Sequence, residues 1–255
     1  MIEVVELVKH FRAGDGEVVR AVDGVSLAVR PGEIVGLLGA NGAGKTTTMR
    51  VLATLLAPTS GTARIGGCDV QHDPLGARRL LGYVSATTGV PDRLTPAEVL
   101  RSYGRLHGLE EERLRTRVDL LLDVLDLRSC ADRPCGRLSS GQRQRTSLGR
   151  ALVHDPPALV LDEPTSALDI LGSRDLLDFL ERLRGEGRAI LLSTHRLHEI
   201  ERRCDRFVVI HAGRVVAEGT RDALVAGRPG GLEEAFFAAV AGRDAAGMSA
   251  AGGAP

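Results

Sequence analysis

The stretch from Gly39 to Thr46 constrains this chain more than any other. It reads Gly-Ala-Asn-Gly-Ala-Gly-Lys-Thr and fits the phosphate-binding loop pattern G-x-x-x-x-G-K-[ST] at every fixed position. A short apolar run at residues 33–38 precedes it, as expected of a buried parallel strand. After the loop a helix is predicted, with its buried side formed by Met49, Val51, Leu52 and Leu55. The order strand, loop, helix is the context in which backbone N–H groups and a helix N-terminus hold a polyphosphate.

Lys45 is the loop residue whose type carries the most chemical meaning. The chain has 33 basic residues, of which Lys9 and Lys45 are lysines and the others arginines. A planar guanidinium cannot replace a compact ammonium inside a tight phosphate loop, so a lysine at this position indicates a chemical requirement. We expect Lys45 to neutralise the outer phosphates and the Thr46 hydroxyl to bind Mg²⁺.

Composition excludes several other classes of protein. The chain has 255 residues with equal numbers of acidic and basic side chains, which favours one large domain and gives no support for nonspecific nucleic-acid binding. No apolar stretch is long enough to cross a bilayer and no signal-peptide core is present, so a cytosolic chain is expected. The cysteines show no C-x-x-C pairing, which favours free thiols over a metal site or disulfides: Cys68, Cys130, Cys135 and Cys204.

The hydrophobic pattern divides the chain into parts. Residues 2–30 read as three strands around Gly/Asp turns, which predicts a small antiparallel β unit. From about residue 95 to 153 apolar residues recur at spacings of three and four, which predicts an inserted helical subdomain. Strands and helices then alternate, so the main sheet is expected to be mainly parallel with helices on both faces. The segment 241–255 is rich in Ala and Gly and is predicted to be disordered.

Two carboxylates close the apolar strand predicted at residues 158–161. In a phosphate-loop protein the strand end is where Mg²⁺ and the attacking water lie. We therefore expect Asp162 to assist the metal and Glu163 to polarise the water. His195 ends the next predicted strand, where an imidazole can hydrogen-bond the γ-phosphate. A histidine at a strand end is more often structural, but its position and neighbours favour the functional interpretation.

Residues 138–142, Leu-Ser-Ser-Gly-Gln, precede another predicted helix. Small hydroxyl and glycine residues at a helix N-terminus make an anion site, although alone they are an ordinary N-cap. Their meaning comes from the order of the motifs along the chain. The phosphate loop comes first, then this segment, then Asp162-Glu163, then Ser-Ala-Leu-Asp at 166–169, and finally His195.

In this order the motifs resemble those of the ATP-binding subunits of ABC transporters, over about residues 2–240. The family signature LSGGQ is matched by residues 138–142. The resemblance implies an α/β fold with a P-loop NTPase core, an N-terminal antiparallel β subdomain and an inserted helical subdomain. It also implies that ATP and Mg²⁺ are bound and that ATP is hydrolysed.

The resemblance also implies roles for single residues. Phe11 would stack on the adenine, although its position alone fits a partly buried core Phe equally well. Glu163 would be the catalytic base, His195 the switch histidine, and Thr46 and Asp162 the residues that assist Mg²⁺. The phosphates would be bound by Gly39, Ala40, Asn41, Gly42, Ala43, Gly44, Lys45, Thr46 and Thr47.

Family members work as pairs of subunits in a head-to-tail arrangement. In such a pair, Asp169 belongs to the loop that couples the two sites, and the partner's ATP is capped by Ser139, Ser140, Gly141 and Gln142. The resemblance thus implies a homodimer, or pairing with a second ATPase subunit. It also implies a separate transmembrane permease subunit and a location at the cytoplasmic face of the membrane.

Two departures from the family pattern bear on turnover. Ser140 replaces the second glycine of the signature, which could weaken closure of the dimer. Ala86 stands where the family normally has a glutamine that contacts Mg²⁺ and signals to the membrane partner. Neither departure removes Glu163 or His195, so hydrolysis remains the favoured interpretation.

Residues 88–95 resemble a stretch of the ABC-2 exporter ATPases, including sodium-efflux members, and residues 231–237 resemble their C-terminal helix. A plain amphipathic cap helix explains residues 231–237 equally well. These matches suggest export, with a sodium ion or a drug-like compound as the cargo. The alternatives are an ABC-type ATPase that acts on nucleic acid or ribosomes, and a soluble regulator with negligible turnover. We expect no nucleic-acid partner.

Overall fold

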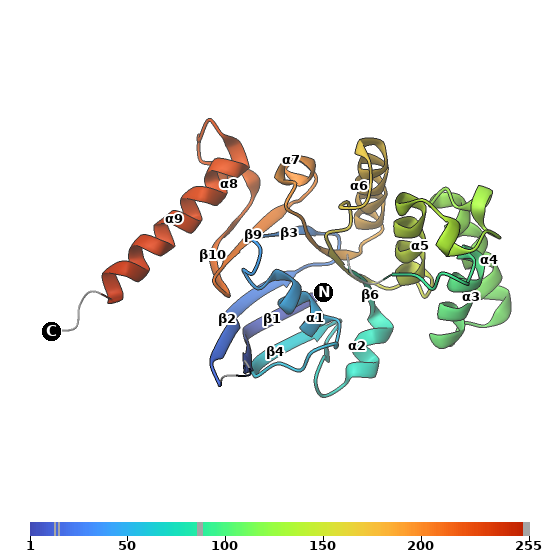
Figure 1. Ribbon diagram of the computed structural model, residues 1–255, viewed down its shortest axis with the longest axis horizontal. Coiled ribbons are helices and arrows are strands. Elements are labelled where there is room, and N and C mark those ends of the chain that lie inside the picture. The colour runs from blue at the N-terminus through green and yellow to red at the C-terminus, as the bar shows by residue number, and fades with distance from the viewer. Residues whose placement is uncertain (13, 15, 86–88, 252–255) are drawn as a thin grey trace.

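Two sheets organise the chain in the computed structural model, which describes residues 1–12, 14, 16–85 and 89–251 (Figure 1). The N-terminal sheet has the strand order β2-β1-β4-β5 and is antiparallel. Its strands are β1 (Ile2–Arg12), β2 (Val18–Val29), β4 (Ser60–Ile65) and β5 (Cys68–Asp69). The antiparallel unit is thus as predicted, but residues 18–29 form one strand rather than two. Gly24, at φ 84°, lets the strand bend while β1 pairs with it on both sides.

The second sheet has the order β10-β9-β3-β8-β7-β6. Its strands are β3 (Ile34–Leu38), β6 (Leu81–Ser85), β7 (Ala158–Asp162), β8 (Ala189–Ser193), β9 (Arg206–His211) and β10 (Arg214–Gly219). β9, β3, β8, β7 and β6 are parallel, and β10 is antiparallel to β9. Every residue of β3, β7 and β8 is buried, which explains their continuous apolar runs.

Helix α1 (Lys45–Leu52) lies between the two sheets and helix α6 (Ile170–Gly185) covers the other face of the parallel sheet (Figure 1). The alternation along β3 supports both layers, since Val35 and Leu37 pack on the α1 side and Ile34 and Leu38 on the α6 side. α1 is shorter than predicted. Thr54 has φ 58°, a left-handed conformation that ends the helix, so Leu55 is 59% exposed instead of buried.

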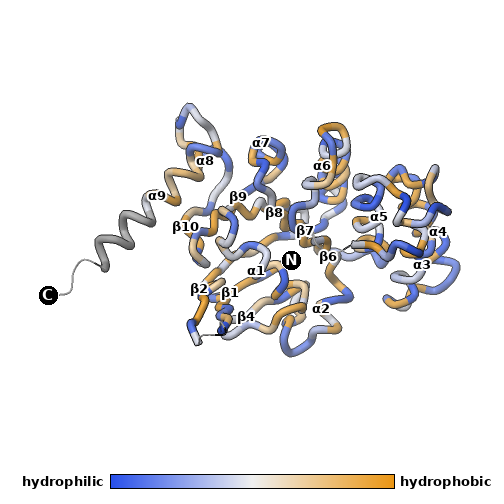
Figure 2. The backbone as a smooth tube through the Cα atoms, viewed as in Figure 1, coloured by the Kyte–Doolittle hydropathy of each residue, from blue (hydrophilic) through white to orange (hydrophobic). Residues whose placement is uncertain are grey.

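The segment predicted as a helical subdomain contains α3 (Pro96–Leu106), α4 (Glu111–Val124) and α5 (Ser140–Leu152), with short 3₁₀ turns at Arg128–Cys130 and Cys135–Arg137. α3 begins with a capping box, in which Thr95 and Glu98 each bond the other's backbone N–H. Figure 2 shows hydrophilic and hydrophobic residues alternating along these helices, as expected of helices with one buried face.

The remaining helices are short, apart from the last one. They are α2 (Pro74–Leu80), α7 (Leu197–Ile200), α8 (Arg221–Val225) and α9 (Gly231–Ala251). α9 buries Leu232 near its start and extends away from the sheets (Figure 1). It is helical to Ala251, which differs from the disorder predicted for 241–255. Alanine is the strongest helix former, and its propensity outweighs the occasional glycine of this segment. Residues 252–255 lie outside the described residues.

The described residues include no helix long and apolar enough to cross a membrane. All four cysteines are free, as predicted. Within the same described part of the chain, no group of three or more His, Cys, Asp or Glu side chains is arranged to hold a metal ion.

Candidate nucleotide site

The phosphate loop joins β3 to α1 and depends on glycine at two close contacts. A Cβ atom on Gly44, which has φ 110°, would lie 2.5 Å from the carbonyl oxygen of Ala21 in β2. A Cβ atom on Gly39 would lie 2.5 Å from the carbonyl oxygen of Ile210 in β9. The loop is therefore packed directly against backbone from both sheets, and side chains at these positions would push it out of place.

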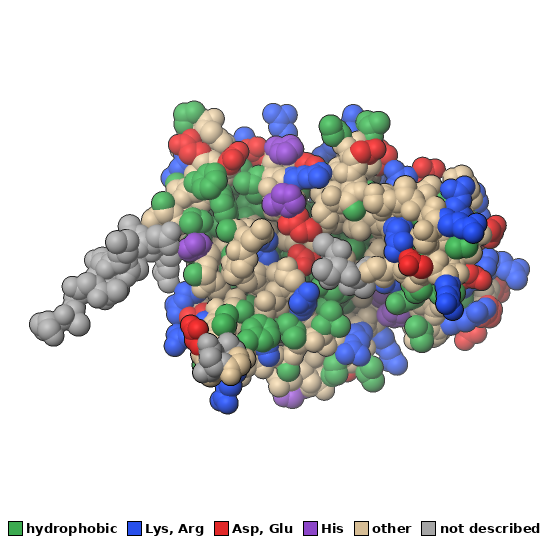
Figure 3. Space-filling view, in the orientation of Figure 1, with side chains coloured by type: hydrophobic (Ala, Val, Ile, Leu, Met, Phe, Trp, Pro, Cys, Tyr) green, Lys and Arg blue, Asp and Glu red, His purple; other side chains and the backbone are tan. Residues whose placement is uncertain are grey.

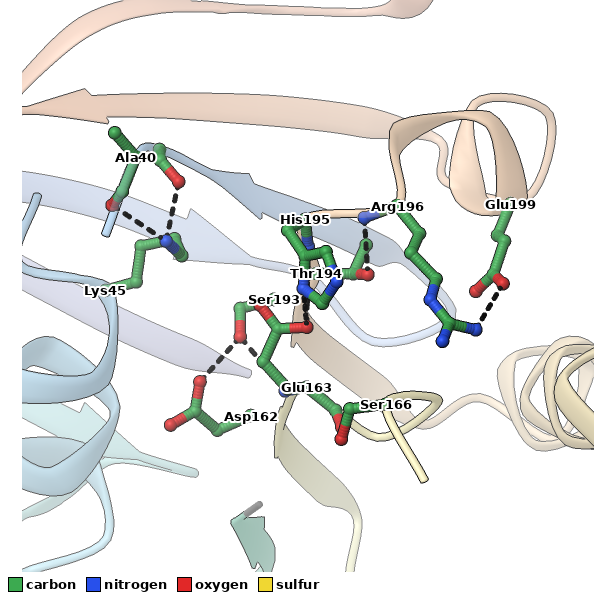
Figure 4. A network of polar contacts seen from close by, with 11 residues as sticks. Ala40, Lys45, Asp162, Glu163, Ser166, Ser193, Thr194, His195, Arg196 and Glu199 are labelled. Carbon is green, nitrogen blue, oxygen red and sulfur yellow. Dashed lines mark hydrogen bonds and ion pairs between the residues drawn. The ribbon is translucent and has the colours of Figure 1, made fainter. Parts of the chain in front are cut away.

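Lys45 opens α1 and its ammonium group stays at the loop (Figure 4). Its Nζ donates to the carbonyl oxygens of Gly39 at 2.6 Å and Ala40 at 3.1 Å. Lys45 is only 7% exposed, and burial lowers its pKa, while the nearby carboxylates of Glu163 and Asp162 oppose that shift. The loop thus holds one positive charge close to the two carboxylates that the sequence singles out.

A residue that the sequence did not single out, Ser193, connects the Asp162 carboxylate to the Glu163 backbone (Figure 4). β7 and β8 pair with Asp162 beside Ser193, both of them at the carboxyl ends of their strands. The Ser193 hydroxyl donates to Oδ1 of Asp162 at 2.7 Å, and the backbone N–H of Glu163 donates to Ser193 Oγ at 3.2 Å. Ser193 is fully buried and Asp162 is 3% exposed, so this bond fixes the carboxylate. The sequence did offer one signal for this role, namely a polar residue at the end of an otherwise apolar strand.

Glu163 and His195 make the second contact of the network. Oε2 of Glu163 lies 2.8 Å from Nδ1 of His195, and the His195 backbone N–H reaches the same oxygen at 3.4 Å. Glu163 has φ 53°, a left-handed conformation that is costly for a residue with a side chain. Its side chain is 20% exposed and that of His195 is 62% exposed, so both groups reach solvent. Figure 3 shows acidic and histidine side chains gathered in the middle of this face.

The oxygen donors around this site suit a hard cation. Thr46 offers a hydroxyl at the start of α1 and Asp162 a carboxylate, and Mg²⁺ prefers such ligands. Asp162 is flanked in register by Ser85 of β6 and Ser193 of β8, which keeps the surroundings polar. Ala86, the departure from the family pattern, lies outside the described residues.

The signature segment forms a separate cluster. Ser139 caps α5, with its hydroxyl accepting the Gln142 N–H at 3.2 Å, while Gln142 Oε1 accepts the Ser139 N–H at 3.1 Å. Ser140 is the exposed first residue of α5, and a Cβ on Gly141 would meet nothing closer than 3.5 Å. In the described part of the chain, Ser139 and Gln142 form hydrogen bonds within this segment and with α5. α5, which begins with the signature, lies apart from α1 and its phosphate loop (Figure 1).

The two remaining predicted residues lie at element ends. Asp169 is the N-cap of α6 and accepts the Gly172 N–H at 2.7 Å. Phe11 lies near the end of β1, 38% exposed, with the Lys9 ammonium 5.1 Å from its ring centroid. Phe11 is therefore not a buried core residue, and its ring is accessible to a planar ligand. Thr48 adds a support for the loop that the sequence did not indicate, since its hydroxyl donates to the Gly44 carbonyl at 2.9 Å.

A phosphate loop followed by α1, with carboxylates and an imidazole at the carboxyl edge of neighbouring parallel strands, defines a nucleoside triphosphatase of the phosphate-loop class. Residues 22–166 match the sequence profile of the family described as "ABC transporter". The chain is 37% identical over 225 residues to the ABC transporter ATP-binding protein NatA of Bacillus subtilis, covering 88% of this chain and 91% of NatA. The chain therefore belongs to the ABC transporter family, as an ATP-binding subunit.

Further comparisons agree with this family membership. The Nod factor export ATP-binding protein I of Paraburkholderia xenovorans is 42% identical over 209 residues, which cover 82% of this chain and 69% of that protein. A solved ATP-binding subunit of an ABC transporter superposes with a TM-score of 0.85 at 33% identity, covering 94% of this chain and 99% of the other. The dimeric cassette MJ0796 bound to ADP and Pi superposes with a TM-score of 0.79 at 26% identity, covering 86% and 98%. Such domains are ATPases that form dimers and work with transmembrane subunits.

Proposed function

We propose that this chain hydrolyses Mg²⁺-bound ATP in a head-to-tail dimer and thereby powers export through a separate transmembrane subunit. The observation that carries the proposal is the separation of the motifs into two clusters. The phosphate loop, Asp162, Glu163 and His195 lie together, whereas Ser139 to Gln142 cap their own helix. A second subunit in the opposite orientation would supply the missing signature to each phosphate loop.

Within one subunit, the described contacts suggest a role for each group. Lys45 and the loop N–H groups would hold the β- and γ-phosphates, and Thr47 would add a hydroxyl at the start of α1. Thr46 and Asp162 would hold Mg²⁺, which supplies positive charge to the phosphate oxygens when bound. Ser193 would keep the Asp162 carboxylate in place.

Glu163 is the group placed to act as the base. Its carboxylate would accept a proton from water as the water oxygen attacks the γ-phosphorus, and the bond to the ADP oxygen breaks. The His195 ring would fix the Glu163 side chain through the 2.8 Å contact and would lie close to the γ-phosphate. The exposed Phe11 ring would stack on the adenine, and Asp169 would lie at the boundary with the second subunit.

We infer the direction of transport and the location of this chain from its similarity to the relatives. One relative is named for Nod factor export, and the NatA match covers most of both chains. We therefore place this chain at the cytoplasmic face of the membrane, bound to a permease that exports a small cargo such as an ion or a drug-like compound.

The head-to-tail arrangement can be tested by complementation between two inactive variants. Lys45→Ala removes the phosphate-binding ammonium, and Ser139→Arg blocks the signature. Each variant alone forms only defective sites. In a mixed pair, the loop of the Ser139 variant meets the intact signature of the Lys45 variant. Mixing equal amounts should therefore restore up to about a quarter of the wild-type sites.

The readout is steady-state release of phosphate with Mg²⁺ across a range of protein concentrations. Wild-type turnover should rise faster than linearly with concentration and stop when Mg²⁺ is chelated. A mixture that stays inactive while wild type turns over would rule out head-to-tail sites. Binding of ATP without turnover by wild type would point instead to a regulator.

A further inference from the structure

A cavity of about 460 Å³ is lined by residues of α5 in the helical subdomain and of α6 in the core, and no residue of the phosphate loop lines it. Figure 1 shows α5 and α6 as neighbouring helices. Its volume is in the range of small-molecule sites, which are about 300 to 1,000 Å³. Six of the apolar side chains that line it are Val84, Leu125, Leu148, Leu168, Leu176 and Phe179. All six are buried, so the cavity presents a preformed apolar surface formed by β6, α5, α6 and the residues next to α4 and α6.

Charged side chains surround the cavity, and they are not evenly paired. Arg145 on α5 lies 2.8 Å from Asp126 and 3.8 Å from Asp175 on α6, so one guanidinium serves two carboxylates. Asp175 has the longer contact, and its side chain is 70% exposed. The lining also includes Asp178 and Glu181, which share Arg203 at 2.7 Å each, so of the four lining carboxylates Asp175 lies farthest from its nearest arginine. The guanidinium of Arg182, which also lines the cavity, lies 5.4 Å from the ring centroid of Phe179.

The cavity is next to the parts of the chain that carry the proposed chemistry. Pro164, directly after Glu163, and Leu168, directly before Asp169, both line it. Gln144, two residues after the signature, donates to the Pro164 carbonyl at 2.9 Å. A molecule in the cavity would therefore touch the loop between Glu163 and Asp169 and the helix that begins with the signature.

We propose that this cavity binds a small hydrophobic amine, with its apolar body between α5 and α6 and its ammonium group at Asp175. Its site is separate from the nucleotide, so it changes turnover rather than ATP affinity. The effect on turnover rests on the proposed function, whereas the binding itself does not. The Asp175 carboxylate, which among the lining carboxylates lies farthest from its nearest arginine, attracts the ammonium and orients the amine.

Dansylcadaverine, a naphthalene sulfonamide with a primary ammonium group, is a suitable probe. Its fluorescence should shift to the blue and saturate with wild type, in the absence and in the presence of excess ATP. Asp175→Lys should weaken binding about tenfold, because attraction becomes repulsion at a partly exposed position. Asp132→Lys, the same change at another exposed aspartate outside the cavity, is the matched control and should have no effect.

Two further experiments test whether the cavity itself holds the probe and whether the site prefers a positively charged ligand. Val124→Trp, at a half-buried lining position, should fill the cavity and reduce binding, with the thermal midpoint reporting that the variant is folded. Dansylglycine carries the same ring with a carboxylate and should bind wild type more weakly. Equal affinity of wild type and Asp175→Lys, displacement by ATP, or tighter binding of dansylglycine would each overturn the proposal. Binding that follows these expectations in a protein without turnover would leave this site standing and count against the proposed function.

Discussion

Oε2 of Glu163 and Nδ1 of His195 lie 2.8 Å apart at the ends of two neighbouring strands. The Ser193 hydroxyl supports the Glu163 end of this pair, because it donates to the Asp162 carboxylate and accepts the backbone N–H of Glu163. Glu163 is kept in a left-handed conformation, and surrounding contacts must offset the cost of that strain. Strain of this kind aims a side chain at a fixed place, as a general base requires.

Glu163→Gln should abolish turnover while ATP still binds. The amide cannot accept the proton of the attacking water, so phosphate release should fall at least about 100-fold. Equilibrium binding of ATP should stay within about threefold of wild type, and the ATP-bound dimer should live longer by size-exclusion chromatography. Glu112→Gln, an exposed change on α4, is the control. Unchanged turnover in Glu163→Gln would remove this residue as the base.

Comparison of His195→Asn with His195→Ala should show whether His195 acts by positioning the Glu163 carboxylate. The asparagine amide can reach Glu163 from about the place of Nδ1, whereas alanine leaves the carboxylate with only the longer contact from the backbone N–H of residue 195. We expect kcat to fall about 100-fold in His195→Ala and clearly less in His195→Asn, with little change in KM for ATP. The check is a full ATP titration of each variant. Equal kcat values for the two variants would contradict a positioning role.

Gly44→Ala and Gly42→Ala should differ in cost, although both glycines have positive φ. Gly42, at φ 80°, has no atom within 4 Å of its Cβ position, so alanine there should cost about 1 kcal/mol. Gly44→Ala adds a 2.5 Å approach to the Ala21 carbonyl and should cost about 2 kcal/mol or more, with loss of ATP binding. Urea unfolding and ATP binding of both variants would test this order.

Ser140→Gly should tighten the ATP-driven dimer. Ser140 is the exposed first residue of α5, in the segment proposed to face the partner's ATP. Removing its hydroxymethyl group lets the backbone approach more closely, at a small cost in helix propensity of about 0.5 kcal/mol. The dimer dissociation constant, measured in a Glu163→Gln background, should fall by a few fold. A weaker dimer would show that the serine hydroxyl contributes a contact of its own.

Stability should fall on acidification because of His154. Its ring stacks on His107 with centroids 3.7 Å apart, and burial lowers its pKa from 6.5 to about 4, with His107 and Arg117 adding to the shift. The unfolded chain therefore binds a proton between pH 6.5 and pH 4 that the folded chain excludes, so stability rises with pH in this window.

The size of this effect can be measured by urea unfolding at pH 7 and pH 4.5. His154 should contribute a loss of up to about 3 kcal/mol on acidification. His154→Phe should flatten the pH dependence while keeping the stack with His107. His72→Phe, at a side chain that is 82% exposed, should leave the wild-type pH dependence in place. A wild-type slope in His154→Phe would contradict the assignment.

Much of the fold follows from local patterns. The continuous apolar runs of β3 and β7 indicate buried parallel strands, and the spacing of glycines and Lys45 indicates the loop between strand and helix. The capping box at Thr95 and Glu98 marks the start of α3. These features involve residues near one another in the chain, so the sequence alone contains the physical cause. The same holds for the order of motifs that indicates the family.

Contacts between distant segments could not be predicted in this way. Asp162 and Ser193 meet only because β7 pairs with β8, and Gly44 must be glycine only because Ala21 of another sheet lies against it. The two strand patterns of residues 18–29 become one strand because β1 pairs with both halves.

Along the sequence, the signature and the phosphate loop belong to one ordered series of motifs. In the folded chain they lie in different clusters. Sheet order and subdomain packing are set by the burial of apolar faces across the whole chain. The types of residue in the sequence and the spacing of the motifs therefore determine which chemical groups this protein can use. The assembly of that chemistry into sites depends on long-range packing, which no local pattern specifies.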